Sequence, residues 1–204
     1  MGARPIHRVL GAVLLLPMAG WCMTALFFFF KPGWDAAYGP ARVKTLPLED
    51  AAAGAHGIAG PGALEVRRLR TSLGEHLLVR TGAGWEQRDP ASGAARPRPD
   101  PQTLKPLFDE IAANDPGRYG VVTSLKADGS DGATAATSTG ASLSLDWATL
   151  SVSQRGRDTD RIDGLYRIHY LQWTGVAAID RPLGLIGISA LALLAALGAR
   201  LIVK

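Results

Sequence analysis

Two uncharged apolar runs, one near each end of the chain, dominate its hydrophobic pattern. Residues 9–30 carry no charge and end in a row of phenylalanines before Lys31. Residues 182–203 are uncharged except for Arg200. About 20 apolar residues in a helix cross the roughly 30 Å of hydrocarbon in a bilayer. The pattern therefore predicts a transmembrane helix in each run.

A cleaved signal peptide is the alternative interpretation of the first run. Its apolar core would be shorter, about 7 to 15 residues, and small residues would follow at a cleavage site. This run is longer and ends in bulky aromatics, and Trp21 precedes Cys22 where a lipoprotein signal has a small residue. We expect an uncleaved membrane anchor, which Pro17 kinks.

The segment between the runs has the pattern of a small α+β domain. Residues 64–69, 75–80 and 85–88 have strand character, and a turn at 89–93 closes the third strand. Apolar residues at spacings of three and four predict a helix over 102–114. Further strands are expected at 119–125, 141–147 and 150–153, and a short helix at 46–53.

Two polar segments are expected to contribute nothing to the core. Residues 127–140 contain only Gly, Ala, Ser, Thr and Asp, which predicts a flexible hairpin tip. Residues 155–163 alternate arginine and aspartate, which is typical of a solvated linker. Residues 46–93 and 102–153 each have the pattern of a helix followed by strands. This weak internal similarity predicts two similar units that share one sheet.

The placement of charge predicts a topology. All 18 acidic residues and 18 of the 22 basic residues lie in 31–181, so the net charge of +4 comes from the chain ends. A nucleic-acid-binding domain would carry a basic patch instead. Cations that flank apolar helices mark the cytoplasmic side of a membrane. We expect both termini in the cytoplasm and the centre across the membrane, with no nucleic-acid partner.

The expected organisation has five parts. They are a cytoplasmic N-terminus (1–8), a first transmembrane helix (9–30), an extracytoplasmic domain (31–162), a membrane-proximal aromatic collar (163–181) and a second transmembrane helix (182–203). Cys22 is the one cysteine, which excludes an intrachain disulfide and a cysteine-rich metal site.

Three short motifs resemble the family of PepSY-associated transmembrane proteins. They are HRVLG at 7–11, the hairpin closed by DPASG at 89–93, and IHYLQWTG at 168–175 before the last helix. The resemblance implies helices packed on a small antiparallel sheet, held outside the cytoplasmic (inner) membrane of a bacterium. Larger relatives with more membrane helices look like ferric-siderophore or flavin-linked reductases and hold haem b between histidines. A chain with two such helices departs from that pattern.

Candidate chemistry in the sequence is sparse. No nucleophile elbow or phosphate-binding loop occurs, so we expect no catalytic residues, no metal site and no enzyme activity. His169 and His7 are candidate haem ligands, and the alternative for each is an ordinary interfacial histidine. One span separates them by about 30 Å, so they cannot hold one haem within one chain. His56 and His76 are expected on the surface.

Three functions stay open at this level. The first is a non-catalytic accessory or regulatory partner of a membrane or envelope system, without a cofactor, binding the bilayer and a membrane or periplasmic protein. The second is a haem b-binding redox subunit, which would need a second copy or another protein. The third is an anchor or assembly factor. A small-residue stripe in 182–203 predicts close contact with 9–30 or with a partner: Ser189, Ala192, Ala196 and Ala199.

Overall fold

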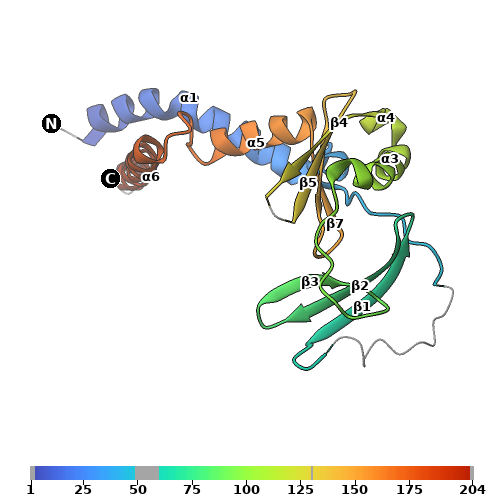
Figure 1. Ribbon diagram of the computed structural model, residues 1–204. Helices are drawn as coiled ribbons and strands as arrows, with labels where there is room; N and C mark the ends of the chain where they lie inside the picture. The colour runs from blue at the N-terminus through green and yellow to red at the C-terminus, as the bar shows by residue number, and fades with distance from the viewer. Residues whose placement is uncertain (1–2, 49–59, 130, 203–204) are drawn as a thin grey trace. The chain divides into compact units, whose positions relative to one another are not determined.

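The chain is an α+β protein with a long apolar helix near each terminus and a central region of two antiparallel sheets (Figure 1). A computed structural model describes residues 3–48, 60–129 and 131–202. The chain divides into two compact units, 1–34 with 158–204, and 35–157.

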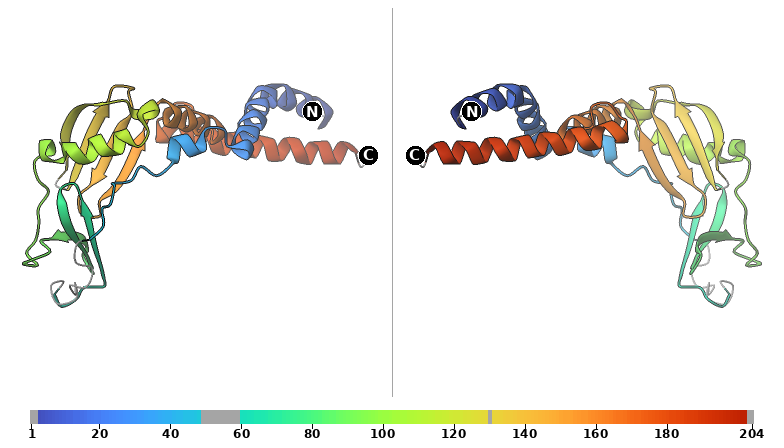
Figure 2. Two further views of the ribbon diagram at one scale, coloured as in Figure 1. Left: turned by 90° about the vertical axis from the view of Figure 1, so that its right-hand side faces the viewer. Right: turned by 90° about the vertical axis from the view of Figure 1, so that its left-hand side faces the viewer.

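Two helices of the first unit are long and apolar enough to cross a membrane, α1 (Ala3–Phe30) and α6 (Ala177–Ile202). They match the two apolar runs of the sequence. Figure 2 shows α1 bent, whereas α6 runs straight. Pro17 lies inside α1, as expected for a kink, because proline lacks the N–H that an uninterrupted helix needs.

Helix α6 packs on α1 without the predicted small-residue stripe. Leu194 lies next to Gly11 of α1, and Gly198 lies next to His7. The described residues of α6 that are partly buried are Gly184, Gly187, Ala190, Leu191, Leu194, Leu197, Gly198 and Leu201. The stripe of Ser189, Ala192, Ala196 and Ala199 is exposed. The prediction that the stripe packs against the first helix is therefore wrong. That a partner contacts the stripe stays a prediction.

Residues 155–163 are not a linker, because most of them belong to helix α5 (Arg157–His169). Asp158 and Asp160 lie in its first turn and Arg167 in its last, which suits the helix dipole. Ile162 is buried and anchors the helix. The alternation of charges hides this single apolar contact from a reading of the sequence. A short helix, α2 (Trp34–Tyr38), follows α1.

The first sheet is a meander of three strands, β1 (Glu65–Thr71), β2 (Gly74–Thr81) and β3 (Gly84–Arg88). All three strands were predicted, and so was the turn after β3, where the Gly93 N–H donates to the Asp89 carbonyl at 2.8 Å. Strand β2 is central and is buried on both faces. Leu77 and Val79 lie on one face, and His76 and Leu78 on the other.

The second sheet has the order β4-β5-β6-β7 and packs with a helix. Its strands are β4 (Val122–Asp128), β5 (Gly132–Thr137), β6 (Ser142–Asp146) and β7 (Ser151–Arg155). They follow η1 (Pro101–Leu104), α3 (Lys105–Ala113) and the unpredicted α4 (Pro116–Tyr119). The main core joins α3 to this sheet and includes Leu107, Phe108, Ile111, Leu143, Leu145 and Trp147. The expected single shared sheet is wrong, because the two sheets are separate.

Strand β5 contradicts the expectation that 127–140 is a flexible hairpin tip that buries nothing. Ala133 and Ala135 are fully buried and pair across the sheet with Leu145 and Leu143. Small residues therefore alternate inward where the core has little room. The predicted helix at 46–53 lies mostly outside the described residues, and Leu46 itself forms a β-bridge with Arg70.

Candidate functional site

His169 ends α5 and contacts α1 through a hydrogen bond. Its Nδ1 lies 3.0 Å from the hydroxyl of Thr24, whose side chain is buried on α1. The rings of Trp21 and Phe28 lie 5.6 and 5.0 Å from the imidazole, one tilted and one edge-on. An imidazole held on three sides by one helix has a fixed orientation.

The Thr24 hydroxyl assigns the tautomer of His169. It donates its single proton to the carbonyl of Gly20 or of Trp21, at 2.9 and 3.0 Å. The same oxygen then accepts from Nδ1–H of His169, so in the neutral imidazole Nε2 is the ring nitrogen without a proton. Metal-binding histidines are oriented in this way, with one ring nitrogen donating to a neighbour. The arrangement supplies one nitrogen able to act as a ligand.

Aromatic rings and an apolar cavity surround this histidine. Tyr166 stacks on Phe28 with ring centroids 4.5 Å apart and on Tyr170 at 5.9 Å. A cavity of about 430 Å³ is lined by His169 together with apolar and aromatic residues of α1, α6 and the loop before α6. Such rings at the end of an apolar helix are typical of the headgroup layer of a membrane.

His7 lies at the other end of α1 and faces α6. A β-carbon placed on Gly198 would lie 3.3 Å from its Cε1, so glycine makes room for the imidazole. Nδ1 of His7 is buried and has no hydrogen-bond partner in the described part of the chain. Thr24, the partner of His169, lies 17 residues after His7, about 26 Å at the helical rise. The structure therefore does not bring the two histidines together.

His76 is fully buried in the second unit, which corrects its expected place on the surface. Its Nδ1 donates to Oε1 of Gln87 at 2.9 Å, and its Nε2 accepts from the Thr71 hydroxyl at 2.8 Å. The amide of Gln87 donates in turn to the carbonyl of Trp147, the residue that follows β6 of the other sheet. This chain of hydrogen bonds joins the two sheets.

The environment of His76 keeps the imidazole neutral. Burial lowers the pKa of His76 because the charged form loses its hydration, and the positive charge of Arg96 lowers it further. The hydrogen bond with Gln87 acts in the opposite direction and is outweighed. Both ring nitrogens are engaged, so this histidine serves packing between the sheets and is not placed for catalysis. His56 lies outside the described residues.

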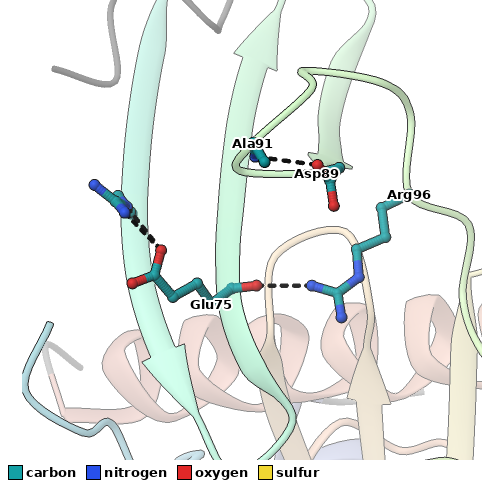
Figure 3. A network of polar contacts seen from close by, with 5 residues as sticks. Glu75, Asp89, Ala91 and Arg96 are labelled. Atoms are coloured by element: carbon teal, nitrogen blue, oxygen red, sulfur yellow. Dashed lines mark hydrogen bonds and ion pairs between the residues drawn. The ribbon is translucent and has the colours of Figure 1, made fainter. Parts of the chain in front are cut away.

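Arg96 fastens the segment after β3 to the first sheet, and Asp89 closes the turn within that segment (Figure 3). Arg96 donates from Nη1 to the Glu75 carbonyl at 2.7 Å, and its own carbonyl accepts from the indole of Trp147 at 3.1 Å. The Asp89 carboxylate accepts from the backbone and hydroxyl of Ser92 and from the Ala91 N–H. These donors hold the pKa of the Asp89 carboxyl below its usual value.

Among residues 3–48, 60–129 and 131–202 no group of three or more His, Cys, Asp or Glu residues is arranged to hold a metal ion. A scan of protein-family models, a search of curated proteins and a search of solved structures each found no match.

Sequence reasoning named His169 and missed the residues that orient it or join the sheets: Thr24, Thr71, Gln87 and Trp147. The buried position of His76, in contrast, had a signal. The consecutive apolar residues Leu77, Leu78 and Val79 indicate a strand covered on both faces, and His76 shares a face with Leu78. The contact of Thr24 with His169 spans 145 positions and has no local signature.

Proposed function

We propose that this chain is a two-pass protein of a bacterial inner membrane whose extracytoplasmic, PepSY-like domain acts without catalysis. It would serve as an accessory or regulatory partner of a membrane or envelope system. The observation that supports this best is that His76, the histidine in the described part of the central domain, has no ring nitrogen left for chemistry. It is fully buried, and both of its ring nitrogens are hydrogen-bonded, to Thr71 and to Gln87.

The edges of the two sheets indicate where a partner would bind. In the described part of the chain, three of the four edge strands carry an additional β-bridge. These are β1 through Leu46, β3 through Ala95 and β7 through Arg42. Strand β4 carries no such bridge, and Thr123 and Ser124 on it are exposed, although η1 and α3 also contact the strand. An edge without a paired strand offers unpaired N–H and C=O groups, to which a partner can add a strand.

Site-specific photocrosslinking in cells tests this function. A photoreactive residue at Thr123 on β4 is expected to give a discrete adduct with a protein that copurifies in mild detergent. The matched control is Ser153 on β7, equally exposed but beside the edge that Arg42 covers. Adducts of equal yield at both positions, or turnover of a small-molecule substrate by the purified protein, would contradict the proposal.

A haem b-binding redox subunit is the second candidate, and the oriented imidazole of His169 favours it. The residues fit a single axial ligand per chain, because His7 lies about 26 Å further along α1. A second ligand would come from another copy or another protein. Expression with haem supplied tests this idea. A Soret band lost in His169→Ala and kept in His7→Ala supports it, whereas no band, or a band that persists in His169→Ala, rejects it.

A further inference from the structure

A charged crevice of about 890 Å³ lies at the N-terminal end of α6. Arg167 from α5, Arg181 from α6 and the loop between the two helices line it. Leu185 and Ile188, one and two turns further along α6 than Arg181, also line it. The crevice therefore has a cationic part and an apolar part.

The one carboxylate that lines the crevice is already occupied. Asp180 accepts from the N–H and the hydroxyl of Thr174 at 3.0 and 2.8 Å, and from the N–H of Gly175 at 2.9 Å. Two arginines and one aspartate leave the lining with a net charge of +1. Arg181 is exposed and makes no ion pair with the described acidic residues.

Arg167 is positioned over this loop by a glycine. Its Nε donates to the Gln172 carbonyl at 3.4 Å. A β-carbon on Gly175 would lie 2.6 Å from its Nη2, and the backbone at Gly175 has φ of 75°, which other residues rarely adopt. The guanidinium thus lies against the loop because position 175 lacks a side chain.

The crevice adjoins the apolar cavity beside His169. Tyr170, Gly184 and Ile188 line both spaces. From there the cavity follows the contact of α1 with α6, past Leu14 and Leu191. A ligand that fits both spaces has an anionic head and a hydrocarbon tail.

We propose that this combined site binds an anionic phospholipid, with its phosphate beside Arg167 and Arg181 and an acyl chain along α1 and α6. The paired N–H groups of an arginine guanidinium can donate to two oxygens of one phosphate. Basic pockets between membrane helices bind phospholipid headgroups. Arg181 is the last charged residue before the uncharged stretch 182–199. In a membrane its guanidinium would therefore lie at the depth of the headgroup layer. The inference rests on the proposed membrane insertion of both helices.

Native mass spectrometry of the full chain in mild detergent tests the proposal. The probe is an equimolar mixture of phosphatidylglycerol and phosphatidylcholine with identical acyl chains. Phosphatidylglycerol adducts are expected to exceed phosphatidylcholine adducts by about fivefold, the effect of roughly one cation beside an anionic headgroup. Arg181→Gln is expected to bring that ratio close to one. Arg161→Gln, an exposed arginine of α5 outside the crevice, is the charge-matched control and keeps it.

A second variant tests the acyl-chain part. A side chain at Gly184 would enter open space, so Gly184→Leu fills the groove without a clash and is expected to reduce adducts of both lipids. Equal adducts of the two lipids in the unmodified protein, or an equal loss in Arg161→Gln, would overturn the proposal. So would removal of the preference by excess inorganic phosphate, because the ligand would then be free phosphate. Protein released from membranes by alkaline washing would refute the membrane insertion itself, whereas retention without lipid preference refutes this inference alone.

Discussion

The imidazole of His76 is fully buried, and both of its ring nitrogens form hydrogen bonds. Protonation would disrupt this arrangement, so the stability of the protein should depend on pH. The usual pKa of histidine is 6.5, and burial lowers the pKa of His76 in the folded protein. Below pH 6.5 the unfolded chain therefore binds more protons than the folded chain. The free energy of unfolding is expected to fall as pH drops from 6.5 towards the lower folded pKa. Above pH 6.5 the contribution of His76 to the free energy of unfolding is fully present.

Comparison with His76→Gln isolates this contribution, since the variant cannot take up the proton. At pH 8 the variant is expected to be less stable by about 2 kcal/mol, because the Thr71 hydroxyl and the Gln87 carbonyl lose well-placed partners. The difference should narrow as pH falls to 5, where the unmodified protein alone loses this stability. Unfolding midpoints measured over this range provide the test. A difference that stays constant from pH 8 to pH 5 would show that His76 does not titrate on unfolding.

At the scale of single elements, strand β5 shows what small residues contribute to a core. Ala135 is fully buried and Ala136, the next residue, is exposed. Ala135→Leu is expected to lower the free energy of unfolding by about 1–3 kcal/mol, because extra methylenes in a packed core force neighbours to move. Ala136→Leu adds the same atoms to the exposed face and should change stability by less than about 0.5 kcal/mol. Denaturant titration of both variants measures this, and equal effects would mean that the strand is not packed as described.

A comparison of β5 with the predicted elements shows which parts of the fold the sequence could predict. Helix α3 was predicted because its large apolar residues recur at the helical period, and β2 because Leu77, Leu78 and Val79 form a short apolar run. Strand β5 was missed because its inward residues are Ala133 and Ala135, which resemble loop residues in composition. Helix α5 was missed because its charges mask the one buried apolar residue, Ile162.

The candidate site, too, was predictable only in part from the sequence. His169 could be singled out as a histidine among aromatics next to an apolar run. Its partner Thr24 could not, because a threonine within an apolar helix ordinarily bonds to its own backbone. Thr24 does so here and also accepts from the imidazole. The second contact depends on how α5 returns to α1, which no local pattern encodes.

At the scale of the whole molecule, the proposed membrane insertion of the two apolar helices implies a topology that labelling can test. Cys22 is the one cysteine and is exposed on α1, so a Cys22→Ser background carries no thiol. A single new cysteine at Ala83, in the exposed turn between β2 and β3, reports on the central domain. One at Arg4, exposed in the first turn of α1, reports on the N-terminal side.

A membrane-impermeant maleimide applied to spheroplasts should label the two cysteines differently. Ala83→Cys is expected to react in intact spheroplasts, and Arg4→Cys only after lysis, because positive charge next to an apolar helix is retained in the cytoplasm and Arg8 still supplies that charge in the variant. Labelling after lysis controls for access, since both thiols are exposed. The reverse pattern would place the central domain in the cytoplasm. The extracytoplasmic role would then be refuted, while the contacts within each unit would stand. Reaction of both thiols before lysis would show that α1 does not cross the membrane.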